Sequence, residues 1–127
     1  MSVWAVGMVK DEADVVEGTI RHMAGEVDGL VVADNNSTDG TRDILERLAK
    51  ELPLVVVDDP DPAYRQSLKM STLAELAVVE CGAEWIVPFD ADELWVSRGG
   101  RRIRDVLPGW SRKVVRADLF NHLCTAL

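Results

Sequence analysis

Four short apolar runs, separated by segments with helical spacing, constrain the fold of this chain more than any other feature. The runs cover residues 3–9, 29–33, 54–57 and 85–89. Strand and helix would thus alternate three times before a fourth strand, an order that favours parallel pairing through right-handed crossovers. The sequence therefore predicts an α/β protein: a Rossmann-like, three-layer α/β/α arrangement with a mostly parallel sheet.

The intervening segments support this order. Val16, Ile20 and Met23 keep helical spacing, and Gly25 marks the expected stop. Further helices are predicted from the spacing of Ile44, Leu45 and Leu48, over residues 64–80, and for one or two turns over 103–107. Residues 113–120 are predicted as a further strand.

Composition limits the class of protein. The chain has 127 residues, which fit one domain, and nearly half of them are apolar. Its formal charge of −8 argues against a nucleic-acid or anionic-membrane partner. Without a signal peptide or a membrane-length apolar run, a soluble, cytoplasmic protein is expected. Cys81 and Cys124 have no metal-site spacing, and Cys81 is expected in the core.

Three of the predicted strands are followed by polar clusters, at residues 10–12, 34–41 and 90–93. The carboxyl ends of parallel strands lie along one edge of a sheet, where open α/β sheets bind their ligands. Each cluster alone could be a helix cap or a solvated turn. Their expected convergence on one edge favours a binding site.

The second cluster contains two kinds of candidate. Ser37, Thr38 and Asp39 are suited to capping the next helix. Capping does not explain Asp34, which directly follows an apolar run and could accept a hydrogen bond from a base N–H or a ribose hydroxyl. Asn36 suits unusual turn dihedrals. The cluster lacks the glycines and lysine of a phosphate-binding loop.

The third cluster follows residues 85–89, which are predicted to be a strand buried on both faces. Asp90 and Asp92 are separated by one small residue, and two close carboxylates repel each other. A hard divalent cation, Mn²⁺ or Mg²⁺, is the simplest compensation. Such a metal could also take up charge on a departing diphosphate. The alternative is a solvated acidic turn.

Three stretches in this order resemble glycosyltransferase family 2, which has the GT-A fold. They are Val-Lys-Asp-Glu-Ala-Asp at 9–14, Asp-Asn-Asn-Ser-Thr-Asp-Gly-Thr at 34–41 and Trp-Ile-Val-Pro-Phe-Asp-Ala-Asp-Glu-Leu at 85–94. The chain is most similar to the branch with Lys-(Asn or Asp)-Glu and Asp-Ala-Asp-Glu motifs. The resemblance covers residues 3–96 and implies an inverting transfer from a UDP- or GDP-type sugar to an acceptor that the sequence does not name.

The resemblance also implies roles for individual residues. Asp34 would contact the base, Asp90 would face the ribose or the metal, and Asp92 would ligate the metal, so that Asp90 and Asp92 are the metal-binding candidates. The residues expected to bind the nucleotide-sugar are Val9, Lys10, Glu12, Asp34, Asn36, Asp90 and Ala91. A side chain on the helix before the fourth strand often helps to hold the nucleotide, and the candidates are Arg65, Gln66 and Lys69. A solvated helix face is the alternative for each of them.

The acceptor side fits the family less well. An inverting transfer needs a general base, and Asp105 and Asp118 are the only carboxylates after Glu93. Asp118 is the weak candidate, and His22 and His122 carry less weight. Residues 1–96 would form the nucleotide-sugar-binding core, and 97–127 the incomplete start of an acceptor-side region. The chain would then be truncated, or completed by a partner or by self-association as a homo-oligomer.

Two further regions leave alternatives open. The basic stretch 98–104 could fold over a diphosphate or be a solvated loop, and the Pro-rich acidic stretch 58–62 is interpreted as surface loop.

Two rival functions also remain. One is a nucleotide-binding fragment without turnover. The other is a haloacid-dehalogenase-like phosphatase, although that motif belongs on a first strand and here the Asp pair ends the fourth.

Overall fold

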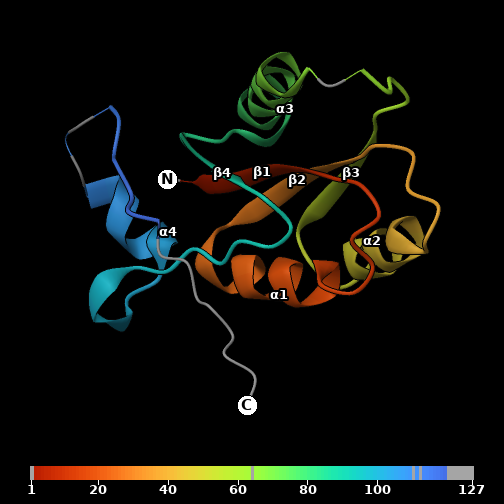
Figure 1. The fold of residues 1–127 in the computed structure, drawn as a ribbon. Helices are drawn as coiled ribbons and strands as arrows, with labels where there is room; N and C mark the ends of the chain where they lie inside the picture. Colours follow the sequence, from red (N-terminus) through yellow and green to blue (C-terminus); the bar gives the residue numbers. More distant parts are fainter. Residues whose placement is uncertain (1, 64, 110, 112, 120–127) are drawn as a thin grey trace.

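The computed structural model describes residues 2–63, 65–109, 111 and 113–119. It contains a four-stranded sheet in which all pairs are parallel and the strand order is β3-β2-β1-β4 (Figure 1). The strands are β1 (Val3–Val9), β2 (Gly29–Asp34), β3 (Leu54–Asp58) and β4 (Trp85–Phe89). The four predicted strands are therefore confirmed, to within one residue at each end.

Helices cover both faces of this sheet. The helices α1 (Val16–Glu26) and α2 (Thr41–Ala49) lie on one face, and α3 (Gln66–Cys81) lies on the other (Figure 1). The predicted three-layer α/β/α architecture is thus confirmed. None of the helices among the described residues combines the length and the hydropathy needed to cross a membrane.

The sheet divides the core into two apolar clusters. Val3, Ala5 and Val9 of β1 pack with α1 and α2, whereas Val6 packs with Leu73 of α3. This alternation follows from the two-residue period of a strand. Every residue of the central strand β2 is buried because helices cover both of its faces.

The strand β4 differs from the sequence prediction. It pairs with β1 alone in the described sheet, so it is an edge strand, and Pro88 is exposed. The prediction of a strand buried on both faces is therefore wrong at this residue. Proline has no N–H to donate to a further strand, so it is tolerated at an edge. Pro88 was the sequence signal for this placement.

After β4 the chain returns along α1. Thr19 donates its hydroxyl to the carbonyl of Ala91, and His22 Nε2 lies 2.7 Å from the carbonyl oxygen of Trp95. Further on, the Ile103 N–H donates to Glu26 at 2.9 Å. The segment therefore runs from the carboxyl edge of the sheet back to the end at which β1 begins, where α4 lies (Figure 1).

This returning segment contains little regular structure. Its elements are η1 (Arg98–Gly100), α4 (Ile103–Val106) and η2 (Leu107–Gly109), which confirms the predicted helical turn over 103–107. The predicted strand over 113–120 is wrong for residues 113–119, which adopt no strand. Its last residue, together with His122 and Cys124, lies outside the described residues.

Candidate functional site

The carboxyl ends of the strands bring the predicted clusters to one edge of the sheet. Val9 of β1 pairs with Asp34 of β2, and Asp34 pairs with Asp58 of β3. On the other side of β1, Gly7 pairs with Phe89, so Asp90 begins beside the last residues of β1. The Cα atoms of Asp34 and Asp90 are thus separated by two strand spacings, about 10 Å.

The loops that follow β1 and β2 are joined by hydrogen bonds. The N–H of Asp11 donates to Ser37 Oγ at 2.9 Å, and the N–H of Thr38 donates to Asp11 Oδ1 at 2.7 Å. Asp11 has a φ of 51°, a left-handed conformation that aspartate tolerates. Lys10 is exposed beside this junction, and Glu12 is half-buried. The first two polar clusters therefore form one connected surface.

The expected caps of α2 are used in this junction. Asp39 accepts from the N–H of Ala13 at 3.1 Å and from the N–H of Thr41 at 3.0 Å. Hydrogen bonding, first from the Thr41 hydroxyl, lowers the pKa of Asp39. The residue at the N-cap position is Gly40, which provides no side-chain cap. Ser37 and Asp39 thus hold two loops together, and only Asp39 also contacts the first turn of α2.

Among the described residues at this edge, Asp34 is the one with an unsatisfied buried side-chain atom. It is 6% exposed, and its Oδ1 accepts no hydrogen bond from any described residue. Its Oδ2 lies 3.9 Å from Arg42 Nη1. Arg42 is engaged by Asp58 and also by Glu46, and these two carboxylates raise the pKa of Arg42. A buried acceptor left unpaired costs about 1–3 kcal/mol, so a ligand N–H or O–H would be well matched here.

A second polar group stands next to Asp34. Asn35 donates its side-chain amide to Asp59 Oδ2 at 2.8 Å, and Lys69 Nζ lies 2.8 Å from the same oxygen. Burial would raise the pKa of Asp59, but the hydrogen bonds from Lys69 and Asn35 outweigh it and lower that pKa. Interpreting residues 58–62 only as surface loop is therefore wrong for Asp59, whose side chain is 13% exposed.

The carboxylates after β4 occupy a closed turn. The N–H of Asp90 donates to Glu93 Oε1 at 3.1 Å, and the N–H of Glu93 donates to the carbonyl of Asp90 at 3.0 Å. Ala91 is buried, and its carbonyl accepts from Thr19. Asp90 and Asp92 are both exposed. Glu93 thus orients the turn, and two carboxylates remain facing solvent.

The carboxylate oxygens of this pair are the kind of ligand that a weakly held divalent metal ion takes. No group of three or more His, Cys, Asp or Glu side chains within the described ranges is arranged to hold a metal ion. Mg²⁺ commonly takes only one or two protein carboxylates and completes its shell with water and substrate phosphates. Asp90 and Asp92 therefore fit a metal that binds together with a diphosphate.

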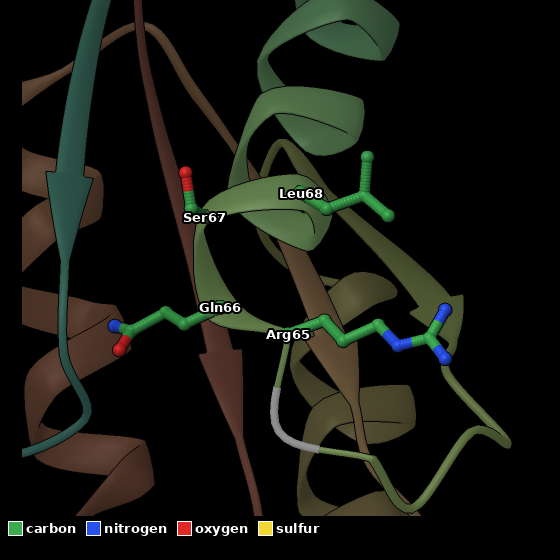
Figure 2. Close-up of a pocket in the computed structure, with 4 residues that line it drawn as sticks. All are labelled: Arg65, Gln66, Ser67 and Leu68. Atoms are coloured by element: carbon green, nitrogen blue, oxygen red, sulfur yellow. The ribbon is translucent and has the colours of Figure 1, made fainter.

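A cavity of about 270 Å³ adjoins the turn. Its lining combines carboxylates, an amide and apolar side chains, contributed by Gln66, Met70, Pro88, Phe89, Asp90, Glu93 and Trp95. A more open hollow lies over the first turn of α3, where Gln66 points toward β4 and Arg65 points to the opposite side (Figure 2). Of the candidates Arg65, Gln66 and Lys69, Gln66 is therefore the one that borders the third cluster.

Two sequence candidates lie elsewhere. Arg104 donates to the carbonyl of Val27 at 3.3 Å, beyond the C-terminal end of α1, so the stretch 98–104 does not cover the carboxyl edge. Asp118 lies 3.9 Å from Arg98 of the same region. The structure thus does not bring Asp118 together with Asp90 and Asp92. His22, by contrast, is a structural residue that binds the Trp95 carbonyl.

Sequence reasoning missed the residues that act through long-range contacts. Asp59, Arg42 and Thr19 are examples, because their partners are distant in the chain. One signal was available for Asp59: an Asp-Asp pair follows the third predicted strand, just as an Asn-Asn pair follows Asp34 after the second. Polar pairs after adjacent parallel strands lie at the same edge of a sheet.

Comparison with solved structures shows which known protein has a similar fold. Crystal structures of S. aureus TarS match the chain, and the 1-349 form superposes with a TM-score of 0.62 at 19% identity. The chain shares the fold of part of TarS. This confirms the α/β fold expected from the sequence. The match covers 74% of this chain but only 28% of TarS 1-349, so the chain spans just over a quarter of that protein.

Two further TarS structures contain ligands. The complexes of TarS 1-349 with UDP and with UDP-GlcNAc each match at a TM-score of 0.55 and 19% identity. They cover 74% of this chain, and 28% and 27% of the respective TarS chains. No family model matches the sequence, and no curated protein matches it either.

Proposed function

We propose that this chain is the donor-binding core of a metal-assisted, inverting glycosyltransferase of family 2, which uses a UDP- or GDP-type sugar. One observation carries the proposal: the buried, unpaired Oδ1 of Asp34 stands two strands away from the exposed pair Asp90 and Asp92. Such an edge offers an acceptor for a base and a carboxylate pair for a metal–diphosphate. The likeness to TarS, which has been crystallised with UDP and UDP-GlcNAc, supports it.

The base end of the site is assigned to Asp34. Uracil and guanine both present a ring N–H, and Asp34 Oδ1 is an acceptor without a partner among the described residues. Pairing them would satisfy the acceptor and add a hydrogen bond to a charged group. The backbone of Val9 and Lys10 continues the same edge and would border the nucleoside, with Glu12 and Asn36 beside it.

The diphosphate end is assigned to Asp90 and Asp92, which would hold Mn²⁺ or Mg²⁺. When bound, that ion would supply positive charge beside the departing diphosphate. The protein's own contribution is to fix the two carboxylates. The turn is held by Glu93 from within and by Thr19 through the carbonyl of Ala91.

The sugar would occupy the cavity of about 270 Å³ next to this turn. Asp90 and Glu93 offer acceptors for sugar hydroxyls, and Trp95 and Phe89 offer apolar surface for the ring. In the transfer, the acceptor oxygen bonds to the anomeric carbon, the bond to the diphosphate breaks, and the acceptor proton passes to a base. We do not assign that base to Asp118, because Asp118 pairs with Arg98 in the segment that returns along α1.

The proposal is tested by calorimetry with UDP and GDP, with and without Mn²⁺ or Mg²⁺. One nucleotide should bind, and only when metal is present. Asp92→Ala should abolish this binding, whereas Asp105→Ala is the matched control because Asp105 is exposed on α4. Metal-independent binding that is unaffected by Asp92→Ala would overturn the metal assignment.

Turnover separates the rival functions. Slow hydrolysis of a UDP- or GDP-sugar, lost in Asp92→Ala, is expected of a transferase core in the absence of acceptor. Binding without hydrolysis would instead indicate a nucleotide-binding module. Phosphate release from p-nitrophenyl phosphate, lost in Asp90→Asn, would indicate the phosphatase and contradict the proposal.

A further inference from the structure

We infer that Lys69, Asp59 and Asn35 form a positioning unit for the nucleobase end of the site, and that Lys69 acts through Asp59 rather than by binding the diphosphate. This inference rests on the proposed function. It concerns a group of side chains that join three separate elements: the loop after β2, the loop after β3, and α3. We call this group the Lys69 unit.

The contacts within the unit are short, and two donors share the same acceptors. Asp59 Oδ2 is 2.8 Å from both Lys69 Nζ and Asn35 Nδ2. Lys69 Nζ also donates to the carbonyl of Asp61 at 2.7 Å, and Asn35 Nδ2 reaches the same carbonyl oxygen at 2.7 Å. Lys69 and Asn35 therefore hold the same two acceptors.

The unit is shielded from solvent. The side chains of Lys69 and Asp59 are 14% and 13% exposed. An ion pair at this depth is screened much less by salt than a surface pair, and loss of one partner would leave an uncompensated charge. Two of the three N–H donors of the Lys69 ammonium group are thus directed to acceptors within the unit, Asp59 and the carbonyl of Asp61.

The unit is attached to the backbone of Asp34. The N–H of Asp59 donates to the main-chain carbonyl of Asp34 at 3.0 Å, and Asn35 is the next residue in the chain. Beside it, Asn36 donates to the carbonyl of Pro60 at 3.0 Å. The backbone that follows the Asp34 side chain is thus tied to the loop after β3. A shift of that loop would move Asp34 Oδ1 relative to the base.

Lys69 could position the base or bind the diphosphate, and these two roles predict opposite effects of Lys69→Met on the affinities for uridine and for pyrophosphate. UDP is measured directly, and uridine and pyrophosphate are measured as competitors, all with Mn²⁺ present. In a positioning role, Lys69→Met weakens UDP and uridine by the same factor, about tenfold or more, the equivalent of one hydrogen bond to a charged group. Pyrophosphate affinity stays unchanged. Lys69→Arg, which keeps the charge, restores most of the loss.

Several results would overturn the inference. If Lys69→Met weakens pyrophosphate but not uridine, Lys69 binds the diphosphate; if neither changes, the unit does not position the base. Lys50→Met is the control, because Lys50 is an exposed cation just after α2. Should Lys69→Met fail to fold, Asn35→Ala decides by the same measurements, since it leaves the ion pair intact. Absence of both UDP and GDP binding to the wild-type chain would instead refute the proposed function itself.

Discussion

Replacing Asp34 by asparagine should separate ligand binding from folding in this chain. The substitution keeps the size of the side chain and removes its charge. In the unliganded protein Asp34 Oδ1 has no partner among the described residues, and Arg42 approaches Oδ2 only to 3.9 Å while remaining bound to Asp58 and Glu46. Little native stabilisation is therefore lost. The free energy of unfolding should stay within about 1 kcal/mol of the wild-type value.

Binding should respond quite differently. A hydrogen bond to a charged group contributes about 1.5–3 kcal/mol, so UDP or GDP should bind the variant roughly 10- to 150-fold more weakly. Urea denaturation measures the free energy of unfolding, and calorimetry with Mn²⁺ present measures the nucleotide affinity. Asp105→Asn is the matched control, since Asp105 is exposed on α4 at the opposite end of the sheet.

Two results would refute this reasoning. Destabilisation of the unliganded variant by more than about 2 kcal/mol would mean that Asp34 is a structural residue whose contacts hold the fold. Unchanged nucleotide affinity in a stable variant would mean that the unpaired oxygen does not face the base. Either outcome would remove the observation on which the proposed function rests.

Three other perturbations test the remaining parts of the site. In Asp92→Ala, Mn²⁺ titration followed by electron paramagnetic resonance should show no nucleotide-dependent metal binding; retained binding would contradict the role of the pair. Gly7→Ala should destabilise the chain by about 1–3 kcal/mol in urea, because its Cβ would lie 2.9 Å from the carbonyl oxygen of Phe89 and push β4 away; unchanged stability would show that β4 moves freely. The pKa of Asp59 is lower in the folded chain than its ordinary value of 3.8, so ionised Asp59 stabilises the fold at pH values above 3.8. This stabilisation is lost as the pH falls through the pKa of the folded state. Urea midpoints of wild type and Asp59→Asn should therefore converge in acid below that value, and a constant difference across this range would contradict the shift.

Much of the fold could be predicted because its signals are local. Each apolar run is short and ends in polar residues, so the four strands and their carboxyl ends were found to within one residue. The alternation of strand and helix then favoured a parallel sheet, and the edge carrying Asp34 and Asp90 followed from it. Burial on the two faces of β1 also follows the two-residue period of a strand.

The features that the sequence mispredicted or left open depend on distant neighbours. An apolar run looks the same in a central and an edge strand, and only the order β3-β2-β1-β4 made Pro88 an exposed edge residue. The basic stretch 98–104 follows the metal motif closely in sequence. Nevertheless, contacts such as that of Ile103 with Glu26 hold this stretch at the far end of α1.

The sequence by itself determined which residues form strands, which faces of them are apolar, and which side chains follow their carboxyl ends. These properties follow from short-range periodicity and from the turn chemistry of single residues. Only the tertiary structure decided that Asp34 keeps an unpaired oxygen and that Asp59 is held between Lys69 and Asn35. Whether a polar atom is satisfied depends on every group that packing brings within hydrogen-bonding distance. Residues 34, 59 and 69 lie at the end of β2, in the loop after β3 and in α3, and no local pattern records that these three elements meet.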